Sequence, residues 1–214
     1  MDEWQDYWLR MESRSSILER ECLQNIHQLA EWAVENTRGD VVTCSPGNAT
    51  SALVIGNAIR AKCPKYWFYD TRNNFNYYIP DSDYGAYVYS KLHSCDPDKM
   101  VDLFNSLNLG LPIFSSVLNS FNMEIEIPKS ISFLHINASL NVLVKRCLDL
   151  FYDNVEEGGI IVLDDFGWWE GSRRAFYSFC FSHGEYPLLE RCGCSQVYWI
   201  KGRTHNRISG YKIL

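Results

Sequence analysis

Two adjacent carboxylates, Asp164 and Asp165, follow directly after an unbroken apolar run in this chain of 214 residues. The run, Ile160 to Leu163, is typical of a strand covered on both faces, as in a parallel sheet, and the glycine pair before it permits a tight turn with positive φ. Open α/β sheets bind their ligands at the carboxyl ends of their strands. Carboxylates at such a position can orient a hydroxyl group and accept its proton. The sequence therefore predicts a ligand site at Asp164 and Asp165.

Strand geometry limits how many of these side chains reach one site. Adjacent residues of a strand point to opposite faces, so a regular strand directs only one of Asp164 and Asp165 into the site and leaves the other to cap the next helix. We expect one of the two to be a general base and leave both as candidates. His135 and His183 are further candidate proton acceptors if they reach the pocket. A histidine within an apolar strand, such as His135, is more often a hydrogen-bonded core residue.

The elements that must position these residues alternate between helix and strand. Hydrophobic periodicity predicts helices over residues 16–36, 49–61, 98–107, 140–151 and 170–182, and strands over 41–44, 66–69, 112–117, 131–136 and 160–163. The sequence predicts a long polar loop over 72–90, and loops of this length often have a functional role. Strands 188–191 and 196–200 lie too close in sequence for a helical crossover and should form an antiparallel hairpin. We expect an α/β fold with a mostly parallel sheet, helices on both faces and a C-terminal antiparallel hairpin strand. The chain is expected to be one domain, 1–214, with a helical segment over 1–38 and a core over 39–202.

Composition narrows the class of protein. The net charge is −6, and Lys and Arg are scattered except near the C-terminus, so a nucleic acid is not expected as partner. No apolar run approaches the length of a membrane span, and the N-terminus lacks the features of a secretory signal, so we expect a cytoplasmic protein with no membrane partner. Most of the eight cysteines sit singly in apolar runs, as buried thiols do. Cys192-Gly193-Cys194 has no second pair nearby and is interpreted as a structural pair rather than a zinc site.

Several segments resemble the macrocin O-methyltransferase family, whose members methylate sugar hydroxyls with S-adenosylmethionine (SAM). The resemblance is carried by residues 151–167, 171–176, 39–44, 67–70, 187–189 and 197–201. It runs in order over roughly residues 20 to 202, which is stronger than a single motif match, while residues 75–110 match poorly. It implies a class I (Rossmann-like) methyltransferase fold, with SAM as cofactor and a sugar or glycan as substrate.

The resemblance assigns SAM contacts to the turn after the first strand and to the end of the second. The turn contains Thr43, Ser45, Gly47 and Asn48, with Thr43 where the family has Glu and Ser45 where it has the first Gly. Backbone at Gly47 and Asn48 can still approach the amino acid part of SAM at a helix N-terminus. Asp70 ends the second strand, where a carboxylate accepts both ribose hydroxyls. The alternatives are a plain strand-to-helix turn and, for Asp70, a helix cap or loop charge.

A divalent cation in this family is held by three acidic side chains. Asp164 and Asp165 match two of them, whereas Asn137 occupies the first position and Ser139 stands where a second Asp usually follows. An amide oxygen is a weaker ligand for a hard cation and has no basic lone pair at neutral pH. We therefore expect a weakened metal site or none, with Asn137, Asp164 and Asp165 as the ligands of any cation. Asn137 is also placed among the cofactor contacts.

The substrate is assigned to the residues that follow the carboxylates. Trp168 and Trp169 can stack on the apolar face of a sugar ring, and Arg173 can bind a hydroxyl or phosphate; packing at a surface or interface is the alternative for the two tryptophans. Trp4 and Trp8 are expected to cover either the pocket or a subunit interface, and the second case implies a homodimer.

Three functions are consistent with these residues. The first is a SAM-dependent O-methyltransferase that acts on a sugar hydroxyl of a glycan or glycosylated small molecule. The second is a catalytically degenerate binding module of the same fold, favoured by Thr43, Ser45, Asn137 and Ser139. The third is methylation of a phenol or catechol. Asp70, Asp164 and Asp165 favour an enzyme, because a scaffold has no need for carboxylates at strand ends.

Overall fold

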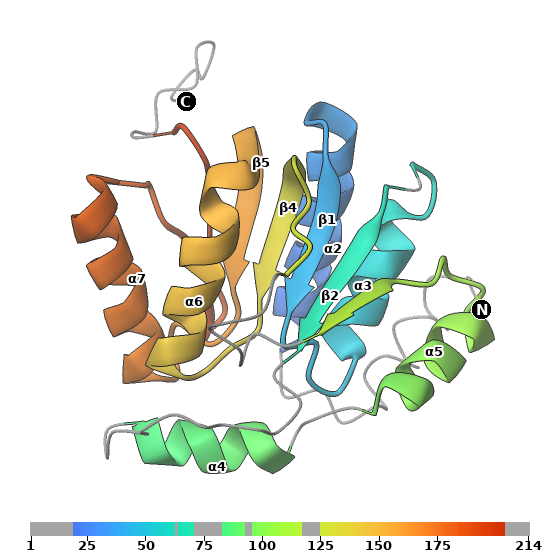
Figure 1. Cartoon of the computed structure of the whole chain (residues 1–214), viewed down its shortest axis with the longest axis horizontal. Helices are drawn as coiled ribbons and strands as arrows, with labels where there is room; N and C mark the ends of the chain where they lie inside the picture. Colours follow the sequence, from blue (N-terminus) through green and yellow to red (C-terminus); the bar gives the residue numbers. More distant parts are fainter. Residues whose placement is uncertain (1–18, 63, 71–82, 93–95, 117–124, 204–214) are drawn as a thin grey trace.

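A seven-stranded sheet forms the centre of the computed structural model, which describes residues 19–62, 64–70, 83–92, 96–116 and 125–203 (Figure 1). The strand order is β3-β2-β1-β4-β5-β7-β6. The strands are β1 (Asp40–Cys44), β2 (Tyr66–Asp70), β3 (Ile113–Ser116), β4 (Ile131–Ile136), β5 (Val155–Leu163), β6 (Glu190–Cys192) and β7 (Gln196–Ile200). The helices are α2 (Arg20–Asn36), α3 (Thr50–Ile59), α4 (Tyr84–Leu92), α5 (Pro97–Ser106), α6 (Asn141–Phe151), the short η2 (Tyr152–Asn154) and α7 (Glu170–His183).

Strand direction explains why one edge of this sheet is suited to a ligand. Strands β1 to β5 pair in parallel, whereas β7 pairs antiparallel with both β5 and β6. The carboxyl ends of the parallel strands therefore share one edge. Strand β1 lies between β2 and β4, so the chain order reverses there, which is the switch point at which such sheets bind ligands. The predicted mostly parallel sheet with an antiparallel C-terminal hairpin is confirmed.

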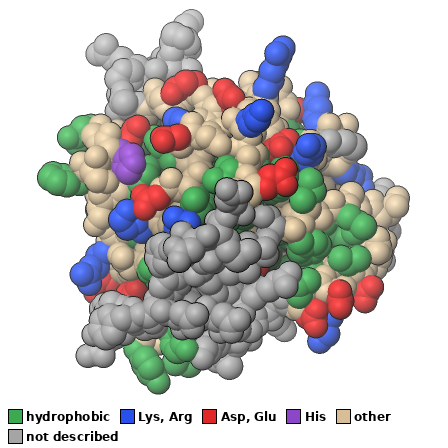
Figure 2. All heavy atoms as spheres, in the orientation of Figure 1, with side chains coloured by type: hydrophobic (Ala, Val, Ile, Leu, Met, Phe, Trp, Pro, Cys, Tyr) green, Lys and Arg blue, Asp and Glu red, His purple; other side chains and the backbone are tan. Residues whose placement is uncertain are grey.

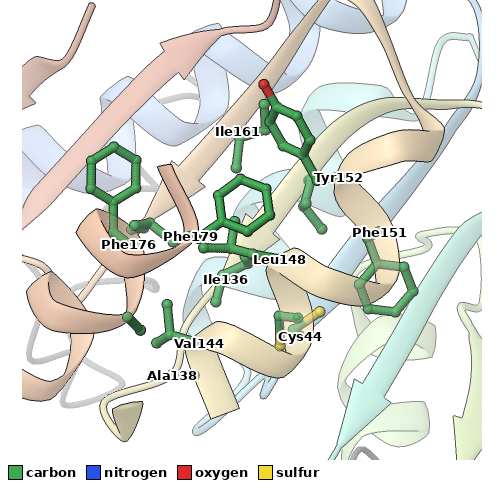
Figure 3. Close-up of a cluster of buried hydrophobic side chains, with 14 of the residues drawn as sticks. Cys44, Ile136, Ala138, Val144, Leu148, Phe151, Tyr152, Ile161, Phe176 and Phe179 are labelled. Carbon is green, nitrogen blue, oxygen red and sulfur yellow. The ribbon is translucent and has the colours of Figure 1, made fainter. Parts of the chain in front are cut away.

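Helices cover both faces of the sheet (Figure 1). Apolar residues of α2 and α3 pack with one face, and those of α6 and α7 with the other. Figure 3 shows the second core, in which Leu148 and Phe151 of α6 and Phe179 of α7 lie over Ile136 and Ile161 of the sheet. Burial of this apolar surface, at about 25 cal/mol per Å², is the main stabilising contribution to the fold.

Helix α4 lies within the segment that the sequence predicts to be a polar loop, so that prediction is wrong for residues 84–90. Ala86 is buried and belongs to the core on the α6 side of the sheet, which gives the helix an anchor. A helix of nine residues depends largely on tertiary contacts for its stability.

Strand β5 begins earlier than predicted, at Val155, and the glycine pair lies inside it. Gly158 has φ +85°, as expected for this pair, but it forms an irregularity in the strand rather than a turn before it. The neighbouring hairpin supplies the reason: the Gly158 N–H donates to the Lys201 carbonyl at 3.1 Å, and the Lys201 N–H donates to the Gly159 carbonyl at 2.9 Å. Cross-strand bonds thus keep the glycines in the sheet.

The described surface mixes charges of both signs. Figure 2 shows acidic and basic side chains interspersed over the face seen in Figure 1. Within the ranges given above, no helix has the length and apolar character that crossing a membrane requires. Trp4 and Trp8, for which we predicted a covering role, lie outside the described residues.

His27 of α2 makes stability depend on pH. His27 is buried, and its Nε2 lies 3.4 Å from Nδ2 of Asn57. Burial lowers the pKa of His27 from its usual value of 6.5. The charge of Glu31 raises this pKa, and the charge of Arg60 lowers it further. Below about pH 6.5 the unfolded chain takes up a proton that the folded protein resists, so the free energy of unfolding falls as the pH falls. We expect His27→Gln to reduce this fall, by at most ~1.4 kcal/mol per pH unit, in urea titrations between about pH 7.5 and about pH 5.5. His183→Gln, at an exposed position, is the control, and equal pH slopes for wild type and His27→Gln would contradict the prediction.

Candidate active site

The turn between β1 and α3 has an unusual backbone. Ser45, Gly47 and Ala49 have φ values of +56°, +56° and +74°. Positive φ is uncommon outside glycine, and two of the three such non-glycine residues in the described part of the chain lie in this one turn. The hydroxyl oxygen of Ser45 is buried there and has no hydrogen-bond partner within the structure. Strained backbone and an unsatisfied polar atom at a helix N-terminus are what a ligand-binding turn requires.

Backbone hydrogen bonds join this turn to the ends of the neighbouring strands. The Ser45 N–H donates to the Tyr69 carbonyl at 2.7 Å, which sets the turn beside Asp70 at the end of β2. The Asn137 N–H donates to the Cys44 carbonyl at 3.0 Å, and the Asp164 N–H donates to the Ile136 carbonyl at 3.1 Å. These bonds bring Ser45, Asp70, Asn137 and the backbone at Asp164 to one edge of the sheet.

Asn48 fixes the start of α3 within the turn. Its side-chain oxygen accepts from the Thr50 N–H at 3.2 Å, while the Ala49 N–H donates to the Pro46 carbonyl at 3.0 Å. An Asn side chain that bonds the backbone two residues later stabilises a turn of this kind. Asn48 thus has a clear structural role, and Gly47, half-buried, leaves the backbone open to close approach.

Asp164 and Asp165 point in different directions, as alternation along a strand predicts. Asp165, 9% exposed, accepts a hydrogen bond from the hydroxyl of Ser139, which follows β4. Asn137 and Ser139 both lie in the segment between β4 and α6. Asp165 therefore lies with the residues at the carboxyl edge of β4 and β5.

Asp164 lies in a fully buried polar network on the α2 and α3 side of the sheet. Its carboxylate accepts from His135 Nε2 at 2.7 Å, from Gln196 Nε2 at 2.8 Å and from the Ser51 hydroxyl at 3.5 Å. Asn25 of α2 donates to Gln196 Oε1 at 2.6 Å and so fixes the orientation of that amide. Three partners on one carboxyl group satisfy a buried polar side chain, which is otherwise costly. This network holds the end of β5 against β7, α3 and α2.

His135 and Thr43 are not brought to the edge with the other predicted residues. They are register partners on β4 and β1, and both are fully buried. His135 Nε2 bonds Asp164, and Thr43 Oγ1 lies 2.9 Å from the hydroxyl of Tyr66. Side chains alternate between the two faces along a strand, and this alternation places both His135 and Thr43 in the core on the α3 side. His135 is therefore positioned as a hydrogen-bonded core residue. Their catalytic and cofactor roles stay predictions, and the geometry gives both residues structural partners.

Asp83 is a buried acidic residue that sequence reasoning missed. It precedes α4, is 3% exposed, and accepts from the Asn141 N–H at 2.8 Å at the start of α6. A carboxylate is favoured there because the unpaired N–H groups of a helix N-terminus carry partial positive charge. A side chain at Gly171, in the first turn of α7, would collide with Asp83, so glycine is needed at that position. Asp83 ties α4 to the first turns of α6 and α7, and only its place just before a helix signals this in the sequence.

The segment after the aspartates is held in place from two sides. Arg173 Nη1 donates to the carbonyls of Phe166 and Gly167 at 2.9 and 3.0 Å. The Gly167 N–H donates to the Ser195 carbonyl at 2.7 Å, and a side chain at Gly167 would collide with the Cys194 carbonyl. Arg173 and Gly167 thereby fix the loop that joins Asp165 to α7.

Trp168 and Trp169 differ in exposure. Trp168 is 58% exposed, whereas Trp169 is half-buried and packs against the core on the α6 side. A side chain added at Gly85 of α4 would lie 3.3 Å from the Trp169 ring, so that ring also lies against α4. Trp168 is therefore the more accessible aromatic surface, and Trp169 has a packing role.

The side chains at this edge do not fit a divalent cation. In the described ranges, no group of three or more His, Cys, Asp or Glu side chains could hold a metal ion. The chemistry of the donors agrees, because Asp164 is bonded to three donors on the far side of the sheet from Ser139 and Asp165. The ligand set of Asn137, Asp164 and Asp165 that the resemblance implies stays a prediction, and its member Asp164 already accepts from three protein donors.

No protein-family model and no curated protein matches the sequence. Solved structures with a similar fold include the O-methyltransferase NovP, at 17% identity over 88% of this chain and 82% of that one, with a TM-score of 0.75. CalS11, a TDP-rhamnose 3′-O-methyltransferase of calicheamicin biosynthesis, is 13% identical over 95% of this chain and 96% of its own, with a TM-score of 0.55. TomG from Streptomyces achromogenes, solved in complex with SAM, is 6% identical over 94% of this chain and 91% of its own, with a TM-score of 0.55.

Similarity at these identities shows the fold. The chain has the Rossmann-like fold of class I methyltransferases, with a mostly parallel seven-stranded sheet and an antiparallel C-terminal hairpin. It spans most of the length of each similar structure, so the likeness is one of whole domains. One fold hosts many activities, so the side chains of the site decide the chemistry.

Proposed function

We propose that this protein is a SAM-dependent O-methyltransferase that transfers a methyl group to a hydroxyl of a sugar or sugar-bearing small molecule, without a divalent metal. The observation that carries the proposal is the strained turn after β1, with the buried and unsatisfied Ser45 hydroxyl, bonded to the end of β2 beside Asp70. Sugar methylation by CalS11 and the fold it shares with this chain support the substrate class.

The residues of the turn and of β2 fit the cofactor. Backbone N–H groups at the start of α3 and the Ser45 hydroxyl can hold the polar amino acid part of SAM. Asp70 lies where a carboxylate accepts hydrogen bonds from the two ribose hydroxyls. SAM supplies a methyl group on a positively charged sulfur, so the protein has only to orient the acceptor and remove its proton.

Asp165 is the residue we assign as general base. It lies at the carboxyl edge with Ser139, whose hydroxyl donates to it and fixes its orientation. Asp164 is fully buried and occupied by His135, Gln196 and Ser51, so it positions the end of β5 instead. A carboxylate within hydrogen-bond reach of a hydroxyl can accept its proton as the new C–O bond forms.

The sugar is assigned to the exposed ring of Trp168. An indole face stacks on the apolar face of a sugar, and Trp168 is the accessible one of the two tryptophans after Asp165. Arg173 holds the carbonyls of Phe166 and Gly167 and so sets the position of the loop that carries Trp168. We assign Arg173 to positioning this loop.

A binding module that has lost catalysis is the second candidate. It is favoured by Thr43, whose hydroxyl lies against Tyr66 in the core where the resemblance implies an acidic contact to SAM. This alternative retains the fold and predicts no methyl transfer to any acceptor.

Incubation of the purified protein with SAM and a panel of acceptors tests the proposal. The panel holds a nucleotide sugar such as TDP-rhamnose, a glycosylated phenol and a free catechol, each assayed with EDTA and with added magnesium. We expect a sugar acceptor to gain the mass of one methylene group, equally under both conditions. Methylation of the catechol alone would replace the sugar assignment, and strong inhibition by EDTA would overturn metal independence. No transfer to any acceptor would favour the binding module.

A further inference from the structure

Two thiols that the proposed function does not use lie where the start of α2 meets the C-terminal hairpin. Cys22 in the first turn of α2 and Cys192 at the end of β6 are both free, and each thiol affects the pKa of the other through a hydrogen-bonding interaction. The Cys22 Sγ also approaches the Cys192 carbonyl oxygen at 3.4 Å across 170 positions of sequence. The hairpin turn and the helix start are thus in direct contact through sulfur.

Gly193 makes this contact possible. It has φ +58°, and a side chain there would lie 2.7 Å from the Cys22 Sγ and would collide with the Glu19 carboxylate. The turn between Cys192 and Cys194 therefore needs glycine both for its backbone conformation and for close approach to α2. Such packing keeps the two thiols adjacent in the folded protein.

We propose that Cys22 and Cys192 form a reversible disulfide that joins the start of α2 to the C-terminal hairpin. A disulfide requires two cysteines at short range, and the Cys22 Sγ lies 3.4 Å from the carbonyl oxygen of Cys192, with its thiol close enough to the Cys192 thiol to affect the pKa of both. The site is independent of SAM chemistry, so it stands or falls separately from the proposed function.

Burial and hydrogen bonding determine which of the two thiols is deprotonated first. Cys22 is fully buried, whereas Cys192 is half-buried. Burial raises the pKa of both thiols, but the hydrogen bond from Cys22 lowers the pKa of Cys192 and raises that of Cys22. Cys192 is therefore the first of the two to become a thiolate, and only a thiolate is nucleophilic.

The oxidant is a low-molecular-weight disulfide such as glutathione disulfide. The Cys192 thiolate attacks one of its sulfurs, a mixed disulfide forms, and one glutathione thiolate leaves. Cys22 then loses its proton and attacks the Cys192 sulfur, which forms the protein disulfide and releases the second glutathione thiolate. Two protein thiols are oxidised and one external disulfide is reduced, so the exchange is balanced and a thiol reductant reverses it.

Other described cysteines differ from this pair in exposure or in hydrogen bonding. Cys194 is exposed, but its thiol donates to Glu19 Oε1 at 3.1 Å, and this hydrogen bond raises its pKa. Cys44 and Cys147 are hydrogen-bonded to each other as well, yet both are fully buried and burial raises the pKa of Cys44. Among the cysteines that the structure describes, only Cys22 and Cys192 combine contact between thiols with partial exposure of one partner.

Peptide mapping after oxidation tests the proposal. The full-length protein, in buffer with EDTA, is treated with glutathione disulfide, digested without reduction and analysed by mass spectrometry. We expect the intact protein to lose the mass of two hydrogen atoms and one cross-linked peptide to contain Cys22 and Cys192. The Tm should rise on oxidation, because the cross-link restricts the unfolded chain, and should return on addition of dithiothreitol.

Serine variants at the two hairpin cysteines make the result specific. Cys194→Ser should form the same cross-link as wild type, whereas Cys192→Ser should form none and show no rise in Tm, with far-ultraviolet circular dichroism confirming that each variant is folded. A link between Cys192 and Cys194, a stable glutathione adduct on Cys192, or unreacted Cys22 in the folded protein would each overturn the proposal.

Discussion

Replacing Asp165 by asparagine is expected to slow methyl transfer by about 100- to 10,000-fold, the contribution of a positioned general base. Asparagine keeps the shape of the side chain and can still accept from Ser139, but it has no basic lone pair at neutral pH. SAM binding should remain, because the Asp70 carboxylate and the β1–α3 turn are untouched. Initial rates under saturating SAM, together with a SAM binding titration, measure the two effects separately.

An exposed aspartate provides the matched control for this experiment. Asp153→Asn, in η2, removes a carboxylate that is exposed to solvent and should leave the rate of methyl transfer unchanged. A rate for Asp165→Asn equal to that of Asp153→Asn would refute the assignment of Asp165 as base.

Replacing Asp164 by alanine is expected to lower the free energy of unfolding by ~3–5 kcal/mol, the usual cost of removing one member of a buried ionic network. The change leaves His135 Nε2 and Gln196 Nε2 without their acceptor in the core. It also frees the end of β5 from the Ser51 hydroxyl at the start of α3. Urea denaturation, with a fixed m-value as the check for two-state behaviour, measures the loss.

Asp102→Ala is the control for stability, because Asp102 is exposed on α5 and surface substitutions of this kind stay within about 0.5 kcal/mol. Asp165→Asn should also lie near wild type in stability. If Asp164→Ala destabilised no more than Asp102→Ala, the buried network would not be a major source of stability.

The strands and most helices follow from local patterns in the sequence. Apolar runs such as Ile131–Ile136 predict buried strands because a strand covered on both faces must be apolar throughout. The short spacing between the last two strands predicts the antiparallel hairpin for a steric reason. Helix α4 was missed because its anchor, Ala86, is a tertiary contact that no periodicity announces.

The edge of the sheet that holds the candidate site was predictable from the sequence, but the hydrogen-bond partners of its side chains were not. The strand end at Asp164 and Asp165 predicted the edge of the sheet, and the resemblance to the macrocin O-methyltransferase family added Ser45, Asp70 and Asn137. The division of roles between Asp164 and Asp165 depends on which face of β5 each one takes, and a shift of one residue reverses that choice. Gln196 comes from a strand far along the chain, so its bond to Asp164 has no local signal. The same holds for Asp83, which reaches the start of α6 from a different segment.

Isothermal titration of the purified, folded protein with SAM tests the central claim most directly. We predict saturable binding of one SAM per chain. Asp70→Ala should weaken it by about 10- to 100-fold, equivalent to the ~1.5–3 kcal/mol of hydrogen bonds to a charged group. Asp153→Asn should bind SAM as wild type does. No heat of binding and no shift in Tm at millimolar SAM, from a protein that circular dichroism shows to be folded, would contradict the account.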